Sequence, residues 1–261
     1  MTAHTAPPIL HPFRRWTYDA AMGPLALLIF ALLAADGGTV PAPATALPPG
    51  AVELLPRGAA PDAKLPLIIA IHGRGGNALR FAQFIQVLGP PARIVSLQAP
   101  DRWGEGYSWL ELPLASAAGD DRELTRAIAG RAADLQPVIA RIAAGRPHCG
   151  DPIIVGYSQG GAITLALAVS APPGFKAQYF EVAGALPPSF PFSDHLPDLV
   201  GFHGTADQSV SYAEAVATFQ RAPRTVTWTL FAYEGAGHDP SRELRQDLGD
   251  ELQKASRRAC R

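Results

Sequence analysis

The sequence predicts an α/β fold, with a mainly parallel central sheet and helices on both faces. Short apolar runs alternate with longer helix-compatible segments from residue 52 onward, which is the order of βα units. Residues 67–71 are continuously apolar, as expected for a strand buried on both faces of a parallel sheet. At residues 153–169 an apolar run, a tight glycine-rich turn and a second apolar run follow one another.

Each element is predicted from its own local pattern. The apolar runs predict strands at residues 67–71, 94–97, 153–155, 179–182, 199–203 and 226–231, with a short edge strand at 52–55. Helices are predicted at residues 78–88, 121–144, 162–169, 212–221 and 241–258. Asn77 is expected to cap the first helix, and Pro137 to kink or break the second. Between residues 99 and 120 we expect a long aromatic loop.

Length and composition indicate one folded domain with an N-terminal extension. The 261 residues are 48% hydrophobic and 17% charged, which suits one large α/β domain. Eight of the 26 prolines fall within the first 50 residues, so the sequence changes character there. We predict a signal peptide or membrane anchor at residues 1–36, a Pro-rich linker at 37–50 and one folded α/β domain at 51–261.

The N-terminal segment indicates export. Arg14 and Arg15 precede an uncharged apolar run at residues 20–35, and small residues follow it. This pattern is typical of a secretory signal, which gives a periplasmic or secreted protein. The run is also close to the length of a membrane span, so an uncleaved anchor is the alternative.

Charge and cysteine content exclude several classes of function. The formal net charge is −1 and no long basic run is present, so nucleic-acid binding has no electrostatic basis. Cys149 and Cys260 lack metal-ligand spacing and form no C-x-x-C motif, so neither a zinc site nor a thioredoxin-type centre is predicted. In an exported protein the two cysteines could pair as a disulfide. The sequence alone favours neither the disulfide nor two free thiols.

The turn Gly156-Tyr157-Ser158-Gln159-Gly160 is predicted to present a nucleophile. A serine between a strand and a helix adopts a strained backbone, and the two glycines let neighbouring backbone approach closely. The following helix starts at the serine, so the N–H of Gln159 can point at a developing oxyanion. This is the nucleophile elbow of α/β hydrolases, and a plain glycine-rich turn is the alternative.

A serine nucleophile requires a histidine or similar base and an acid that orients the base. In α/β hydrolases the serine comes first along the chain, the acid second and the base third. His238 is the one histidine of seven that follows a suitable acid, and it lies just beyond the last predicted strand. Asp207 follows the strand at 199–203 and is the predicted acid, with helix capping as its alternative role. His203 is the rival base, and Asp194 and Asp198 are rival acids ahead of that strand.

The stretch His72-Gly73-Arg74-Gly75-Gly76 follows the strand at 67–71 and is predicted to supply a second oxyanion donor. The backbone N–H of Arg74 or of Gly73 would serve, because glycines let this loop approach the serine. Two other interpretations are a simple turn and a phosphate-binding loop, although the lysine of a P-loop is missing.

Together these motifs resemble the phospholipase/carboxylesterase family of α/β hydrolases, which includes acyl-protein thioesterases and bacterial carboxylesterases. The similarity spans about residues 65–252 and rests on the His-Gly loop, the elbow, the stretch from His203 to Val210, and Gly237-His238. The resemblance implies Ser158, Asp207 and His238 as catalytic triad, and the amides of Arg74 and Gln159 as oxyanion hole.

The chain departs from the thioesterases of this family in two places. Those enzymes usually have an aspartate after the second glycine of the His-Gly loop, and this chain has Gly75-Gly76-Asn77 there instead. Cytosolic thioesterases also lack an export segment. Family members use the region at residues 102–110 beside the site, so Trp103, Tyr107 and Trp109 are predicted substrate-binding residues. The alternative is that Trp109 and Leu110 cover the core.

The sequence therefore predicts an exported serine carboxylic-ester hydrolase, similar to carboxylesterases and lysophospholipases, which acts through an acyl-enzyme. Its expected partner is a small-molecule ester, and it needs no metal or organic cofactor. A polyester or aryl-ester hydrolase is the enzymatic alternative. From another class, a non-catalytic, membrane-tethered binding module could keep the same fold.

Overall fold

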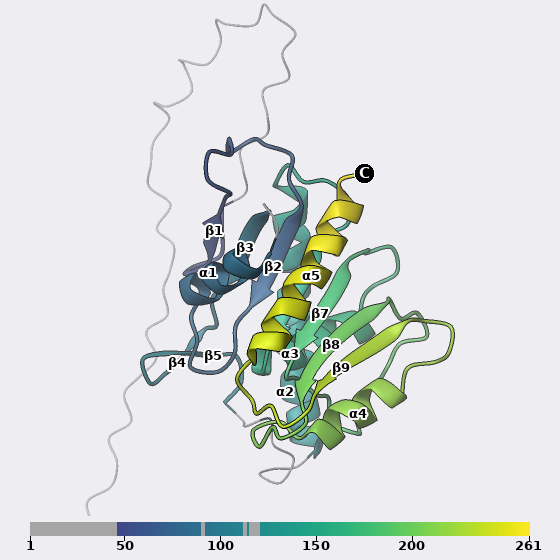
Figure 1. The fold of residues 1–261 in the computed structure, drawn as a ribbon. Coiled ribbons are helices and arrows are strands. Elements are labelled where there is room, and N and C mark those ends of the chain that lie inside the picture. The colour runs from purple at the N-terminus through teal and green to yellow at the C-terminus, as the bar shows by residue number, and fades with distance from the viewer. Residues whose placement is uncertain (1–45, 90–91, 112–113, 115–120) are drawn as a thin grey trace, which may run out of the picture. The chain divides into compact units, whose positions relative to one another are not determined.

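Seven strands form the central sheet in the computed structural model, which describes residues 46–89, 92–111, 114 and 121–261 (Figure 1). They are, in spatial order, β1 (Val52–Leu54), β3 (Arg93–Leu97), β2 (Leu67–Ile71), β6 (Ile153–Tyr157), β7 (Gln178–Val182), β8 (Leu199–Gly204) and β9 (Trp228–Tyr233). Neighbouring strands are parallel except for β1, which pairs antiparallel with β3 at one edge. The predicted α/β fold with a mainly parallel sheet is confirmed.

Strand β2 shows why continuous apolar runs form the centre of this sheet. All five of its residues are fully buried, as predicted. Because successive side chains point to opposite faces, Leu67, Ile69 and Ile71 join one hydrophobic cluster and Ile68 and Ala70 join another. The sheet therefore separates two cores, and each must be covered by helices.

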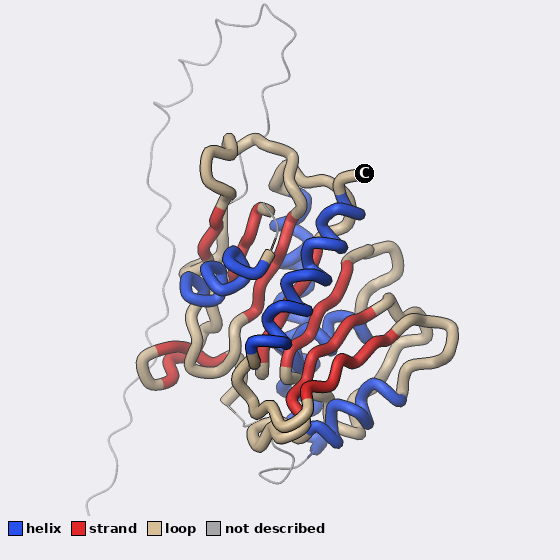
Figure 2. Tube along the Cα trace, in the orientation of Figure 1, coloured by secondary structure: helices blue, strands red, loops and turns tan. Residues whose placement is uncertain are grey.

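Helices cover the two faces of the sheet (Figures 1 and 2). Helices α1 (Ala78–Leu88) and α5 (Arg242–Ala259) contact each other and pack on one face. Helices α2 (Asp121–Ala144) and α3 (Gln159–Val169) pack together on the other, where Phe219 of α4 (Tyr212–Gln220) joins the same cluster. Every residue of α3 is buried, which explains why its sequence is apolar on all sides.

Side-chain caps fix where three helices begin. The side chain of Asn77 accepts a hydrogen bond of 2.9 Å from the amide of Arg80, which confirms the predicted cap of α1. Ser211 and Glu214 form a capping box at the start of α4, and Ser241 caps α5.

Three details differ from the sequence-based expectations. Helix α2 continues through Pro137, so the predicted break is absent. Strand β9 begins at Trp228 and ends at Tyr233, two residues later than predicted. The aromatic loop contains a small hairpin of β4 (Asp101–Trp103) and β5 (Gly106–Ser108). Its two-residue turn begins with Gly104 at φ 56°, a left-handed conformation that favours glycine.

The predicted N-terminal segment, residues 1–36, and most of the predicted linker lie outside the described residues. Leu47, at the end of the predicted linker, packs against the core. Among the described residues, no helix is long and apolar enough to span a membrane.

Cys149 and Cys260 form a disulfide, which resolves the alternatives that the sequence left open. It links the segment ahead of β6 to the end of α5. The neighbouring Gly150 has φ 63°, and a Cβ there would collide with the backbone of Ala259, so glycine lets the two segments approach.

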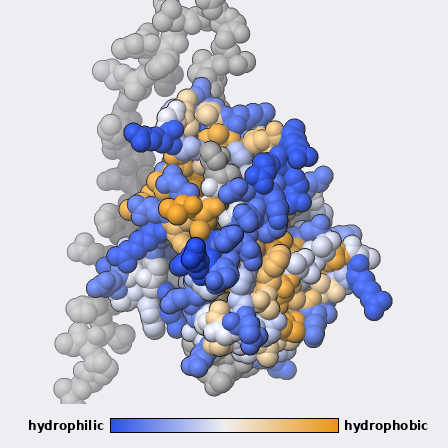
Figure 3. Space-filling view, viewed as in Figure 1, coloured by the Kyte–Doolittle hydropathy of each residue, from blue (hydrophilic) through white to orange (hydrophobic). Residues whose placement is uncertain are grey.

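Hydrophobic surface gathers over α1 in the space-filling view (Figure 3). Val87 and Leu79 of this helix are 85% and 47% exposed. The other side of α1 buries Phe81, Ala82 and Ile85 against the sheet.

Candidate active site

Ser158 lies on a strained turn between β6 and α3. Its backbone has φ 56° and ψ −116°, one of two positive φ values at non-glycine residues in the described chain. A Cβ at Gly156 would collide with the carbonyl of Gly160, and a Cβ at Gly160 would collide with the carbonyl of Ile71. Both glycines are therefore required by close backbone contacts, as the elbow motif predicts.

A chain of two hydrogen bonds joins Ser158 to His238 and Asp207. Oγ of Ser158 lies 2.9 Å from Nε2 of His238, and Nδ1 of His238 lies 2.7 Å from Oδ2 of Asp207. Because an ionised carboxylate only accepts hydrogen bonds, Nδ1 donates to Asp207 and Nε2 is left to accept from the serine hydroxyl. Ser158 follows β6, Asp207 follows β8 and His238 follows β9. All three therefore lie at the carboxyl ends of the strands, where parallel sheets place their sites.

Asp207 is held as an anion by several donors. Its side chain is fully buried, and its Oδ1 accepts hydrogen bonds from the amides of Ser209 at 2.8 Å and Val210 at 3.0 Å. Burial alone would raise the pKa of Asp207. Hydrogen bonds from His203, His238 and the Val210 amide outweigh that effect and hold its pKa below the usual range.

The rival residues occupy other positions. His203 is fully buried, and its Nε2 lies 2.9 Å from the carbonyl of Val210, so it shapes the turn that carries Asp207. Asp198 is exposed ahead of β8, where it accepts a hydrogen bond of 2.7 Å from the amide of Thr227. Asp194 is exposed in the same connection. Ser211, and not Asp207, caps α4.

The His-Gly loop lies against the serine. A Cβ at Gly73 would be 3.1 Å from the Cβ of Ser158, so only a glycine fits there without a shift. The ring of His72 is buried and accepts a hydrogen bond of 3.2 Å from the amide of Ala99, while its Nδ1 lies 2.7 Å from the carbonyl of Gly73. Burial lowers the pKa of His72 more than that carbonyl raises it, which favours the neutral ring.

The hairpin of β4 and β5 holds the same loop from outside. The amide of Gly75 donates to the carbonyl of Tyr107 at 2.8 Å, and the amide of Tyr107 donates to Gly76 at 2.9 Å. The Arg74 guanidinium stacks 4.8 Å from the ring centroid of Trp103, which is 48% exposed. The loop with the predicted oxyanion donor is thus paired with the predicted substrate-binding hairpin.

Trp109, also predicted to bind substrate, is 1% exposed and lies in the hydrophobic core. Its Nε1 donates a hydrogen bond of 2.7 Å to the carbonyl of His72, and its ring packs 5.2 Å from the imidazole. This placement corresponds to the alternative in which Trp109 covers the core. Tyr107 is half-buried, and Trp103 reaches solvent.

The two residues flanking Ser158 have side-chain contacts that the motif alone does not predict. The amide group of Gln159 accepts from Ser108 Oγ at 3.0 Å and from the Trp109 amide at 3.1 Å, and donates to the carbonyl of Leu110 at 3.2 Å. The hydroxyl of Tyr157 donates to the carbonyl of His238 at 3.2 Å. These contacts tie the elbow to the aromatic loop and to the histidine loop.

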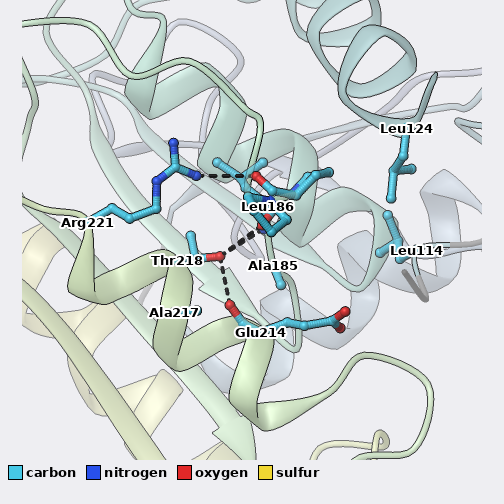
Figure 4. A pocket seen from close by; sticks show the side chains of 10 residues that line it. Leu114, Leu124, Ala185, Leu186, Glu214, Ala217, Thr218 and Arg221 are labelled. Atoms are coloured by element: carbon cyan, nitrogen blue, oxygen red, sulfur yellow. Dashed lines mark hydrogen bonds between the residues drawn. The ribbon is translucent and has the colours of Figure 1, made fainter. Parts of the chain in front are cut away.

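An apolar pocket of about 280 Å³ lies beside the loop that follows β7 (Figure 4). Leu114 and Leu124 face Ala185 and Leu186 across it, and α4 forms its floor. The hydroxyl of Thr218 bonds to the backbone of Leu186 and fixes the loop on the helix. Within the described residues, no cluster of histidine, cysteine, aspartate or glutamate could hold a metal ion.

A serine hydrogen-bonded to a histidine, which is itself hydrogen-bonded to an aspartate, at the carboxyl ends of the strands of this sheet, is the site arrangement of the class of α/β hydrolases. The family model described as phospholipase/carboxylesterase matches residues 59–256, so the chain belongs to that family. It is therefore a serine ester hydrolase. A sequence search against curated proteins finds no match.

Solved structures share the fold at low sequence identity. A carboxylesterase of Bacillus cereus is 17% identical with a TM-score of 0.61, and the match covers 78% of this chain and 93% of that one. Acyl-protein thioesterase 2 of Zea mays is 20% identical with a TM-score of 0.59, covering 79% and 98%. The esterase PE8 is 21% identical with a TM-score of 0.60, covering 78% and 97%.

Proposed function

We propose that the protein is a carboxylesterase that acts through an acyl-enzyme on Ser158. The observation that carries the proposal is the continuous hydrogen-bond chain from Ser158 through His238 to Asp207. Asp207 is buried, charged and fixed by backbone amides, so it can hold the imidazole in the tautomer that accepts the serine proton.

In this mechanism His238 takes the hydroxyl proton as Ser158 Oγ attacks the ester carbonyl. The tetrahedral intermediate collapses, the C–O bond of the alcohol breaks, and His238 returns the proton to the leaving oxygen. Water then attacks the acyl group by the same two steps, and the acid is released. Asp207 stays ionised throughout and stabilises the imidazolium that forms twice in each cycle.

The backbone amides of Arg74 and Gln159 are the proposed oxyanion hole. Gln159 begins α3 immediately after Ser158, where the positive end of the helix dipole favours a developing anion. Gly73 packs on Ser158, so the neighbouring Arg74 lies at the same carboxyl ends of the strands as the serine. The hairpin contacts of Gly75 and Tyr107 hold this loop in place, so the donors need little reorganisation.

Esters of short to medium acyl chains are the proposed substrates, with lysophospholipids as a further class. The pocket of Figure 4 supports this choice, because its lining is largely apolar and its volume is small. The pocket lies at the carboxyl ends of the strands, because Ala185 follows β7 and Glu214 lies in the first turn of α4, the helix after β8. We propose that the acyl chain enters this pocket while Trp103 and Tyr107 lie on the alcohol side.

Export of the protein is also proposed. The disulfide between Cys149 and Cys260 supports it, because such bonds persist in oxidising compartments. Fractionation of producing cells, with the intact mass of the recovered chain, tests the proposal and separates cleavage from anchoring. A full-length cytosolic protein with two free thiols would contradict export.

A fluorophosphonate probe tests the proposed nucleophile directly. We expect covalent labelling of one serine, with the adduct mapped to Ser158 by mass spectrometry of peptides. Ser158→Ala should remove the label, whereas Ser170→Ala, a serine at the other end of α3, should keep it. Folded protein that is not labelled would favour the non-catalytic binding module.

A further inference from the structure

A buried glutamate closes the turn that follows β7. Glu181 has no exposed surface, and its Oε2 accepts a hydrogen bond of 2.9 Å from the amide of Gly184. Its Oε1 has no hydrogen-bond partner among the described residues and lies where a side chain at Gly201 would stand. The side chain of Glu181 therefore folds back along its own chain and binds the backbone three residues later.

The turn that this contact closes is strained. Ala183, in its middle, has φ 53°, and among the described residues Ser158 is the other non-glycine residue with a positive φ. An alanine keeps this conformation only where its surroundings hold it. The amide of Ala183 donates a hydrogen bond of 2.9 Å to the carbonyl of Phe202 in β8. Together with the contact between Glu181 and Gly184, this hydrogen bond fixes the turn.

The same turn supports the candidate nucleophile. The amide of Ser158 donates a hydrogen bond of 2.8 Å to the carbonyl of Val182, the last residue of β7. A Cβ at Gly161, in the first turn of α3, would lie 2.8 Å from that carbonyl oxygen. A Cβ at Gly184 would lie 2.6 Å from the carbonyl carbon of Gly161. The strained turn and the strained elbow thus touch backbone to backbone, so the elbow cannot keep its position if the turn shifts.

Beyond the turn, the chain lines the apolar pocket of Figure 4 through Ala185 and Leu186. The amide of Leu186 donates to the hydroxyl of Thr218 at 3.0 Å, and this hydroxyl lies 3.3 Å from the carbonyl of Leu186. The segment is therefore held at two points, by Glu181 at its start and by Thr218 at its end.

We propose that Glu181 is a positioning residue for Ser158. By accepting a hydrogen bond from the Gly184 amide, it holds the strained turn against the first turn of α3. The serine hydroxyl and the amide of Gln159 are thereby kept in place. The inference rests on the proposed function of Ser158 as the nucleophile, and it gives a role to a buried group that the catalytic hydrogen-bond chain does not use.

This role needs an acceptor oxygen and not a charge. Burial raises the pKa of Glu181 to about 8, so the carboxyl group is mainly protonated at neutral pH. A protonated carboxyl group retains an oxygen that accepts hydrogen bonds. Glu181→Gln keeps such an oxygen and should preserve the function. Glu181→Met has a side chain of similar length and removes the acceptor.

Amide hydrogen exchange, followed by NMR of the whole protein, tests the contact without turnover. In the wild type we expect the amides of Gly184 and Ser158 to exchange as slowly as those of the buried strand β2. In Glu181→Met both should exchange about tenfold or more faster relative to β2, because the turn has lost its acceptor. Glu181→Gln should exchange like the wild type. Fast exchange at Gly184 in the wild type, which needs no variant, or unchanged exchange at Ser158 in Glu181→Met would overturn the proposal.

Kinetics give a second readout. With an acetate ester, Glu181→Met should lower kcat about tenfold with little change in KM, and it should slow fluorophosphonate labelling of Ser158 by a similar factor. Glu181→Gln should match the wild type in both. Glu53→Gln is the control, because Glu53 binds Arg93 and Arg146 from the edge strand β1, so its loss can lower stability but should not change kcat. Wild-type kcat in folded Glu181→Met would contradict the positioning role.

A failure of the proposed function would be visible separately. If Ser158 were not the nucleophile, the wild type would not be labelled by the fluorophosphonate. Slow exchange of the two amides, and its loss in Glu181→Met, would still be observed in that case.

Discussion

Oγ of Ser158 lies 2.9 Å from Nε2 of His238, although 80 residues separate them in the chain. The contact exists because β6 and β9 are parallel strands of one sheet, so the loops that follow them lie at one edge. The hydroxyl of Tyr157 also binds the backbone of His238, and its ring packs 5.3 Å from the imidazole. The residue before the serine thus fixes the loop that carries the histidine.

Asp207 should make stability depend on acid pH. The pKa of Asp207 is lowered in the folded protein from an ordinary 3.8. Its contribution to the free energy of unfolding is therefore complete above pH 3.8 and is lost as pH falls through the folded pKa. Urea unfolding between pH 7 and pH 2 measures this, with Asp207→Asn as reference. The stability difference between wild type and variant should shrink below about pH 4. A difference that does not change with pH would show that Asp207 is not held as an anion.

Replacing Gln159 by alanine should loosen the aromatic loop while keeping the backbone amide. The change leaves buried groups of Ser108, Trp109 and Leu110 without this partner, which costs about 2 kcal/mol or more of unfolding free energy. We expect kcat to fall about tenfold because the elbow and its loop lose their relative position. Gln220→Ala, at an exposed glutamine of α4, is the control and should change neither quantity.

The apolar pocket predicts a change in chain-length preference. Ala217 lines the pocket from α4 and is exposed, so Ala217→Trp should fill the space without disturbing the core. Activity on octanoate relative to acetate esters should fall about tenfold or more. Ala213→Trp, one turn earlier on the same helix and outside the pocket, should keep the wild-type ratio. An unchanged ratio in Ala217→Trp would place the acyl chain elsewhere.

The disulfide should contribute to stability and not to catalysis. It closes a loop of 111 residues, for which the chain-entropy account gives about 5 kcal/mol. Cys149→Ser combined with Cys260→Ser should therefore lower the urea midpoint. Since Cys149 precedes β6 and Ser158 follows it, kcat should remain unchanged in the folded variant. Equal stability of the oxidised wild type and the double variant would contradict this account.

The sequence could predict the fold, and that Ser158, Asp207 and His238 lie close together, from local patterns and from the order of the strands. The elbow needs glycine at Gly156 and Gly160 wherever a serine stands on so tight a turn, and the order of Asp207 and His238 follows from the order of the strands. The comparisons confirm the family that these motifs indicate.

Contacts between distant side chains could not be predicted in this way. The side chain of Gln159 bonds to residues about 50 positions away, and nothing in the motif specifies that. Trp109 packs in the core, and its indole N–H is satisfied there by the carbonyl of His72, a partner that only the packed structure brings near. Glu181 is fully buried in the apolar strand β7. Its carboxyl group occupies space that a side chain at Gly201 would fill, and the sequence around Glu181 does not indicate this. The β4–β5 hairpin was detectable, since Gly104-Glu105 is a two-residue turn with glycine first.

Hydrolysis of p-nitrophenyl esters by wild type, Ser158→Ala and Asp207→Asn tests the central claim most directly, with circular dichroism to show that each protein is folded. We expect loss of essentially all activity in Ser158→Ala. In Asp207→Asn, kcat should fall about 10³-fold to 10⁴-fold because the imidazole loses its orienting partner. Asp198→Asn removes a carboxylate at the start of β8, away from the candidate active site, and this variant should remain active. Substantial activity in folded Ser158→Ala would contradict the account.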